Sequence, residues 1–154
     1  MRGCLAVAAL SALGSQTHAN DIFGTWNCAE RTAKYHSVSQ VGFSKSGQMR
    51  ATVAFQYFEN GQAVARSRAN YRAKYELVGD KFIDRPTFAK VTEFVLRGKD
   101  VRSGPHAEEL KRSLLSSGNG IVLIKFSNPD AFKLVRENGS TIGCQREKAS
   151  RSSS

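Results

Sequence analysis

Few side chains in this sequence have the types and spacing that catalysis or metal binding requires. After residue 19 there are two histidines, His36 and His106, and two cysteines, Cys28 and Cys144. Neither cysteine has a second cysteine or a histidine at the spacing of a metal site. The sequence also lacks H-E-x-x-H, G-x-S-x-G and phosphate-loop motifs. We therefore predict that the protein is not an enzyme and that it binds no metal and no cofactor.

An apolar leader opens the sequence. Arg2 precedes an apolar run from Cys4 to Leu13, and a short polar segment ends at Ala19. This order is typical of a secretory signal peptide, and the run is shorter than the roughly 20 residues that span a membrane. We expect residues 1–19 to be removed and the mature protein to be periplasmic or secreted. Because Cys4 lies at the start of the apolar run and not after it, a lipid-attachment role is not expected for it.

Removal of the leader leaves an even number of cysteines. Cys28 lies near the start of the expected domain, residues 20–147, and Cys144 lies near its end. In an oxidising compartment we expect one disulfide between them, with two buried thiols or a metal pair as the alternatives. Closing a loop of about 115 residues stabilises a fold by about 4 to 5 kcal/mol in the entropy model. Residues 148–154 have nothing to bury, so we expect a disordered tail.

Short alternating runs of apolar and polar residues dominate the remaining sequence, with tight-turn signals between them. An antiparallel sheet built from so many strands can remove its edges by closing into an up-and-down β-barrel. The predicted class is therefore all-β with one short helix. The runs predict about eight strands, at 22–30, 36–44, 49–58, 62–78, 81–84, 90–97, 120–127 with 131–136, and 140–146.

One segment, residues 103–118, has the pattern of a helix. Pro105 occupies its first turn, and Gly118 follows its last residue. Its apolar stripe consists of Ala107, Leu110 and Leu114. We expect this helix to cover one face or an open end of the sheet.

The turn signal at Asn60 and Gly61 allows the register of one hairpin to be predicted. Odd-numbered residues form the apolar side of both flanking strands, so odd positions must face odd positions. A two-residue loop would place Arg66 opposite Phe55, which breaks this rule. We therefore predict a three-residue loop with positive φ at Gly61, which pairs Phe55 with Ala65.

The stretch Gly24-Thr25-Trp26 resembles the G-x-W signature on the first strand of lipocalins and related calycin barrels. In that family the tryptophan plugs the closed end of the barrel, and an arginine from the last strand packs across it. Arg146 lies where that arginine would come from, and a guanidinium on an indole is a favourable cation–π pair. The resemblance implies a lipocalin-like barrel with structural roles for Gly24, Trp26 and Arg146. The expected disulfide would then join the first strand to the last.

The expected inner side of the strand after Gly61 is lined with small residues, namely Ala65, Ser67, Ala69 and Ala73. Such a wall leaves room for a small apolar ligand, unless larger aromatic neighbours fill the interior. Both alternatives stay open at this point. If there is a cavity, we expect its ligand to contact Phe55, Tyr57, Ala69 and Tyr71.

The expected outer side of the same strand is basic, with a row formed by Arg66, Arg68, Arg72 and Lys74. The whole chain has a net charge of +10. Such a row is either a solvated face that prevents aggregation or a docking surface for an acidic protein, an envelope polyanion or lipid head groups. Nucleic acid is a weaker candidate, because an exported protein does not meet it and because Tyr71 and Tyr75 point to the opposite face.

Two functions follow from these features. The first is a carrier or sensor of a small apolar ligand inside the barrel. The second is a protein-interaction module, such as an inhibitor or an envelope assembly partner, that uses the basic outer face. The sequence favours the first, because the family resemblance and the small inner residues agree, whereas a basic outer face also has a simple explanation in solubility.

Overall fold

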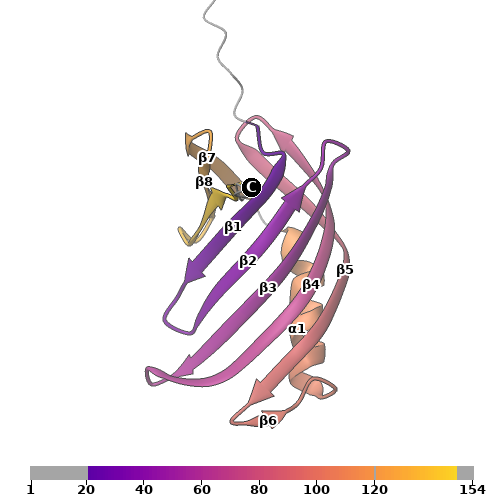
Figure 1. Cartoon of the computed structure of the whole chain (residues 1–154), viewed down its shortest axis with the longest axis vertical. Coiled ribbons are helices and arrows are strands. Elements are labelled where there is room, and N and C mark those ends of the chain that lie inside the picture. Colours follow the sequence, from indigo (N-terminus) through magenta and orange to yellow (C-terminus); the bar gives the residue numbers. More distant parts are fainter. Residues whose placement is uncertain (1–20, 120, 149–154) are drawn as a thin grey trace, which may run out of the picture.

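The protein is a meander of antiparallel strands with one helix inserted near its end (Figure 1). The computed structural model describes residues 21–119 and 121–148. The expected leader, residues 1–19, and all but Lys148 of the expected tail lie outside the described residues. The elements are β1 (Gly24–Arg31), β2 (Tyr35–Phe43), β3 (Gln48–Glu59), β4 (Gln62–Val78), β5 (Lys81–Leu96), β6 (Lys99–Asp100), α1 (Pro105–Ser116), the 3₁₀ turn η1 (Ser117–Asn119), β7 (Val122–Asn128), β8 (Ala131–Arg136) and β9 (Thr141–Arg146).

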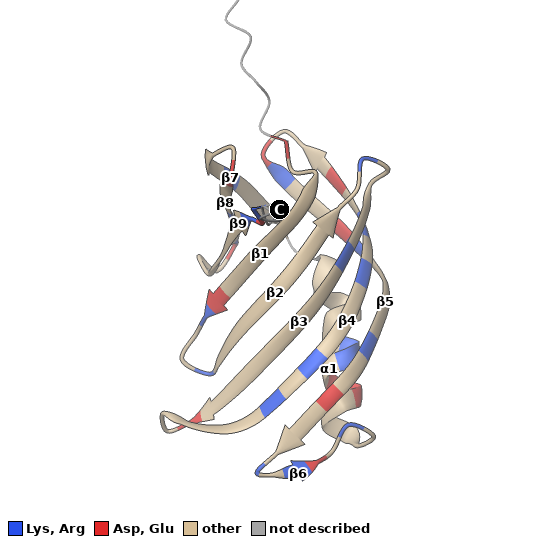
Figure 2. Ribbon diagram, viewed as in Figure 1, with Lys and Arg blue, Asp and Glu red and all other residues tan. Residues whose placement is uncertain are grey.

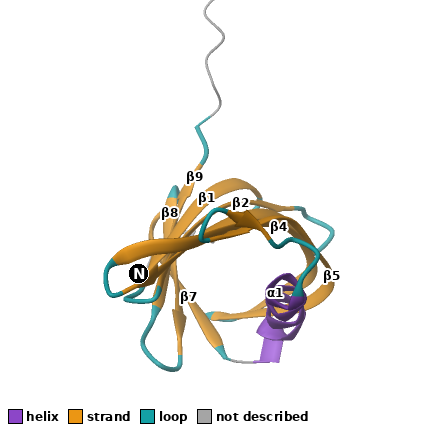
Figure 3. Cartoon of the chain, turned by 90° about the horizontal axis from the view of Figure 1, so that it is seen from below, coloured by secondary structure: helices purple, strands orange, loops and turns teal. Residues whose placement is uncertain are grey.

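The strands form a ring in the order β1-β2-β3-β4-β5-β7-β8-β9, and β9 pairs with β1 to close it. Figure 3 views this ring from below. The predicted class, an antiparallel all-β fold with one short helix and a barrel-like closure, is confirmed. The strand pairing is shortest between β5 and β7, where the described residues form the pairs Lys81–Leu123 and Phe82–Val122. The helix α1 packs against β5 (Figure 3).

The two strands expected at 81–84 and 90–97 are the single strand β5. Its pairing with β4 shifts register at two β-bulges. Pro86 lies at one of them, where a residue without a backbone N–H is tolerated. Thr87 and Thr92 each donate a side-chain hydrogen bond of 3.2 Å to a carbonyl oxygen of β4 beside a bulge. Because of these bulges, residues 85–89, which the sequence pattern does not predict to be a strand, form part of one long strand.

The hairpin between β3 and β4 differs from its prediction. It turns through Asn60-Gly61 alone, with φ of 50° and 77°, so positive φ at Gly61 is confirmed. The predicted three-residue loop and the Phe55–Ala65 pair are wrong, because Phe55 pairs with Ser67. Odd positions still face odd positions, since Val64 is an extra residue that forms a bulge on β4. A bulge within the strand, and not a longer loop, corrects the register.

The helix α1 lies within the segment predicted for it and begins at Pro105. Ala107 is buried, and Leu114 packs against the hydrophobic core. Gly118 does not end the helix in a left-handed conformation but continues into η1. A Cβ atom at this position would lie 2.1 Å from the backbone oxygen of Asp84. Gly118 is therefore needed for the close approach of the helix end to β5.

Candidate ligand-binding cavity

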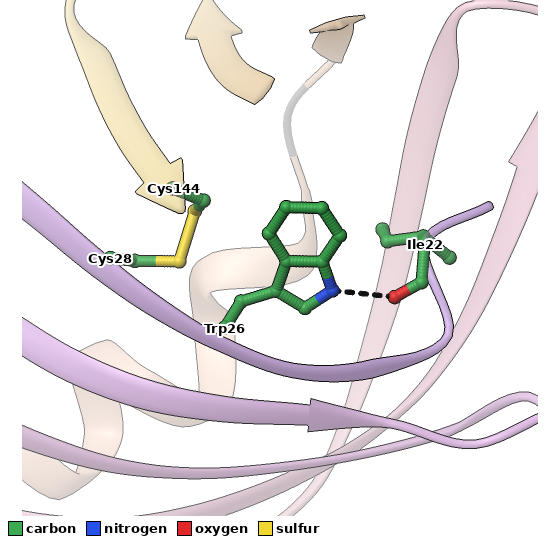
Figure 4. The surroundings of a disulfide bond; sticks show 4 residues. All are labelled: Ile22, Trp26, Cys28 and Cys144. Carbon is green, nitrogen blue, oxygen red and sulfur yellow. Dashed lines mark hydrogen bonds between the residues drawn. A yellow bond between two sulfur atoms is a disulfide. The ribbon is translucent and has the colours of Figure 1, made fainter. Parts of the chain in front are cut away.

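Trp26 lies on β1 beside the disulfide (Figure 4). Its side chain has no exposed surface. Its indole N–H donates a hydrogen bond of 2.7 Å to the carbonyl oxygen of Ile22. Its ring packs edge-on against Phe132, with 4.5 Å between ring centroids. Cys28 and Cys144 are directly opposite each other on β1 and β9 and form a disulfide, as predicted (Figure 4). The first and last strands are therefore joined covalently next to the buried indole.

Arg146 on β9 covers the indole. Its Cζ atom lies 4.3 Å from the Trp26 ring centroid. Its Nη atoms donate hydrogen bonds of 2.6 Å to the carbonyl oxygens of Phe23 and Asp21, and its Nε donates one of 3.1 Å to Asp130. One side chain thereby ties the segment before β1 and the turn between β7 and β8 onto the indole.

Gly24 lies beside this arginine and has a φ of +107°, a conformation that side chains with a Cβ rarely adopt. A Cβ atom at residue 24 would lie 3.2 Å from Nη1 of Arg146. The three residues of the G-x-W resemblance, Gly24, Trp26 and Arg146, thus lie together at this end of the ring.

The interior of the ring holds a cavity of about 300 Å³. This volume is at the small end of the range for small-molecule sites. Its wall is mainly apolar and comes from strands on both sides of the ring and from α1. Representative wall residues are Val41, Ala51, Val53, Leu114, Leu134 and Ile142.

Glu30 and Arg136 form an ion pair in the cavity wall. Glu30 is only 5% exposed, and both of its carboxylate oxygens accept hydrogen bonds from the Arg136 guanidinium. Burial of a carboxylate costs free energy unless a positive charge is paired with it. The contact with Arg136 therefore offsets the cost of burying Glu30. Burial alone lowers the pKa of Arg136, but the hydrogen bond and the charge of Glu30 outweigh it and raise that pKa above its ordinary value. The guanidinium of Arg136 therefore stays charged beside Glu30.

Asp84, on β5, is the third charged residue in the wall. The Tyr71 hydroxyl donates a hydrogen bond of 2.6 Å to Oδ2 of Asp84 and lies 3.3 Å from Oγ of Ser117, next to the end of α1. Burial and the bond to Asp84 raise the pKa of Tyr71 well above its ordinary value, so the phenol stays neutral. No ion pair to Asp84 is found among residues 21–119 and 121–148.

Of the residues predicted to contact a ligand, Phe55 and Tyr71 lie on the cavity wall. Tyr57 also faces inward, but its ring stacks on Phe94 at 5.9 Å between centroids. Ala69 is completely buried. Neither Tyr57 nor Ala69 lines the cavity in this structure.

The three charged wall residues are absent from the sequence prediction, although the sequence contains a signal for Glu30 and Arg136. Glu30 continues the inward row of Trp26 and Cys28 along β1. Arg136 likewise continues the inward row of β8, which includes Phe132. A charged residue at an inward position is a candidate for pairing across the interior.

The predicted partner-binding residues lie exposed along the outer face of β4 (Figure 2). Arg66 pairs with Glu93, with 2.8 Å between Nε and Oε1. Arg72 lies over the ring of Phe88 at 5.0 Å and directly opposite Arg50 on β3. The four residues of this row, Arg66, Arg68, Arg72 and Lys74, are what we call the basic face.

No model of a known protein family matches the chain, and no curated protein matches it in sequence. In the part of the chain that the structure describes, no helix is long and apolar enough to cross a membrane. No group of three or more His, Cys, Asp or Glu residues that could hold a metal ion is found in that part either. The cavity and the basic face are therefore the features of the molecule that bear on its function.

Proposed function

We propose that the protein is a non-catalytic, lipocalin-like binding protein that carries or senses a small, mainly apolar ligand inside the strand ring. The observation that carries this proposal is the cavity of about 300 Å³ with its apolar wall. A mostly apolar pocket with a few convergent polar groups is the usual form of a small-molecule site. The meander of strands and the packing of Arg146 across Trp26 support the lipocalin-like assignment.

A fluorescence experiment tests this function. N-phenyl-1-naphthylamine, an uncharged apolar dye, becomes brighter when it leaves water, and the disulfide-bonded protein should bind it. Ala51 lies on the cavity wall, so Ala51→Leu reduces the available volume. We expect this change to weaken dye binding by about tenfold or more.

The matched control is Ala54→Leu, which adds the same atoms to the outer face of the same strand, where Ala54 is opposite Arg68. This variant should bind the dye as the unmodified protein does. Absence of dye binding by the unmodified protein, or equal losses in the two variants, would contradict the proposal.

Export to the periplasm or the cell exterior is part of the proposal. The leader pattern of residues 1–19 supports it, and so does the disulfide, because disulfides persist in oxidising compartments. Mass spectrometry of protein made with its own leader should find a chain that begins at Asn20. A mature protein that retains residues 1–19 would contradict this part.

The basic face supports a second candidate function, the docking of an acidic protein or an envelope polyanion. Arg50 and Arg72 are directly opposed, and no ion pair to Arg68, Arg72 or Lys74 is found among the described residues. Like charges that face each other across strands are unfavourable for folding. This surface therefore has positive charge available for an anionic partner.

Dextran sulfate is a suitable probe for this second function. Reversal of Arg66, Arg68 and Arg72 to Glu should weaken its binding strongly, and the binding of the unmodified protein should decline as salt rises. The control reverses Lys125 and Lys133, an opposed basic pair on β7 and β8. Equal losses of binding free energy per reversed charge in the two variants would show that net charge, and not the basic face, attracts the polymer.

A further inference from the structure

The cavity and the whole chain have opposite charge. The chain has a net charge of +10. The charged residues in the cavity wall are Glu30, Asp84 and Arg136. Because Arg136 binds both oxygens of Glu30, these two charges compensate each other. The charge that remains in the wall is the negative charge of Asp84.

The carboxylate of Asp84 has hydrogen-bonding capacity to spare. Its Oδ2 accepts the bond from Tyr71, and no hydrogen bond to its Oδ1 is found among the described residues. An ionised carboxylate offers about four acceptor sites in all. A neutral phenol supplies one donor to these sites but does not cancel the charge.

The end of α1 adds to this negative potential. A helix carries about half a negative charge at its C-terminal end, and α1 has no basic residue in its last turn. Its end lies next to the carboxylate, because Tyr71 bridges Asp84 and Ser117 and because Gly118 approaches the backbone of Asp84 closely. Two independent features therefore favour a positive charge at one place in the cavity.

We infer that the ligand is an amphipathic amine, in which an apolar chain or ring bears a protonated amino group. This inference rests on the proposed function. The ammonium group would bind at Asp84 and the end of α1, and the apolar wall would hold the remainder of the ligand. A fatty acid fits less well, because its carboxylate would meet an arginine already bound by Glu30 and would be repelled by Asp84.

The test compares three probes of equal chain length, octylamine, 1-octanol and octanoate, as competitors of the uncharged dye at neutral pH and low salt. An alkyl ammonium is charged there, as a lysine side chain is. We expect octylamine to displace the dye at about tenfold lower concentration than 1-octanol. The reason is that a hydrogen bond between charged groups is stronger than a neutral one, and the difference in free energy corresponds to about a tenfold difference in affinity. Octanoate should be the weakest competitor.

Asp84→Asn keeps the shape of the side chain and removes its charge. In this variant octylamine and 1-octanol should compete within about twofold of each other. The matched control is Asp80→Asn, which removes the same charge from an exposed position at the β4–β5 turn. This control should keep the preference for the amine.

A second variant, Tyr71→Phe, keeps the charge of Asp84 but removes the phenol that binds it. It should enlarge the preference for octylamine over 1-octanol, because the phenol no longer occupies an acceptor site of the carboxylate. If Asp84→Asn does not fold, as judged by near-ultraviolet circular dichroism, a preference that Tyr71→Phe leaves unchanged would contradict binding of the ammonium group at Asp84.

The outcomes separate this inference from the proposed function. If neither the dye nor 1-octanol binds, the proposed function itself fails. If both bind but octylamine is no better than 1-octanol, or octanoate competes best, the ligand is not an amine. Persistence of the amine preference in folded Asp84→Asn would also overturn the inference, whereas its loss there and its retention in Asp80→Asn would support it.

Discussion

The guanidinium of Arg146 lies 4.3 Å from the Trp26 ring centroid and bonds the backbone oxygens of two residues that precede β1. Loss of the cation–π contact and of hydrogen bonds from a charged donor should destabilise Arg146→Ala by about 2 to 4 kcal/mol. Arg146→Lys should be intermediate, because an ammonium cannot reproduce the planar array of donors. Urea unfolding measures both changes.

Arg85 provides the control for this prediction, since it is exposed and, among the residues that the structure describes, forms an ion pair with Glu76 alone, at 3.6 Å. Arg85→Ala should change the free energy of unfolding by less than about 0.5 kcal/mol. Equal effects of the two alanine substitutions would show that Arg146 does not hold this end of the ring together.

Two glycines allow a test of backbone strain. Gly24 has a φ of +107° and little space before Arg146, whereas a Cβ at Gly143 would meet nothing within 4 Å. Gly24→Ala should lower the stability by about 1 to 3 kcal/mol, and Gly143→Ala should leave it unchanged or raise it slightly. Thermal unfolding of the two variants provides the comparison, and a smaller loss for Gly24→Ala would contradict the assigned role.

The disulfide should stabilise the fold mainly by restricting the unfolded chain. Replacing Cys28 and Cys144 together by alanine should cost about 4 to 5 kcal/mol in the entropy model, while the β1–β9 pairing remains in the folded state. A reducing agent should lower the urea midpoint of the unmodified protein and leave that of the double variant unchanged. Insensitivity of the unmodified protein to reduction would contradict this prediction.

Buried tyrosines should make the protein sensitive to alkali. Burial raises the pKa of Tyr57 and Tyr71 above the ordinary value of 10.0. The unfolded chain therefore releases these protons at a lower pH than the folded chain does. The contribution of these two tyrosines to the free energy of unfolding is complete below pH 10 and is lost as the pH rises above it. Urea midpoints measured between about pH 8 and pH 11 should fall less steeply for Tyr71→Phe than for the unmodified protein. Parallel curves would contradict this assignment.

Local patterns were sufficient to predict most strands, the helix and the disulfide. Alternation of apolar and polar residues depends only on the period of a strand, and the start of α1 at Pro105 depends only on the local backbone. The disulfide followed from counting cysteines, because Cys28 and Cys144 are the two that lie beyond the expected leader. The positive φ of Gly61 followed from the freedom of glycine in tight turns.

The register of β3 against β4 and the chemistry of the cavity required the tertiary structure. The hairpin sequence requires odd positions to face odd positions, but only the structure shows that a bulge at Val64, and not a longer loop, meets this requirement. Glu30 and Arg136 are 106 positions apart in the sequence and meet only because β9 joins β8 to β1. The surroundings of Asp84 likewise depend on how the end of α1 packs against β5. Local preferences determine the strands, but the environment of a buried charge depends on which distant elements close around it.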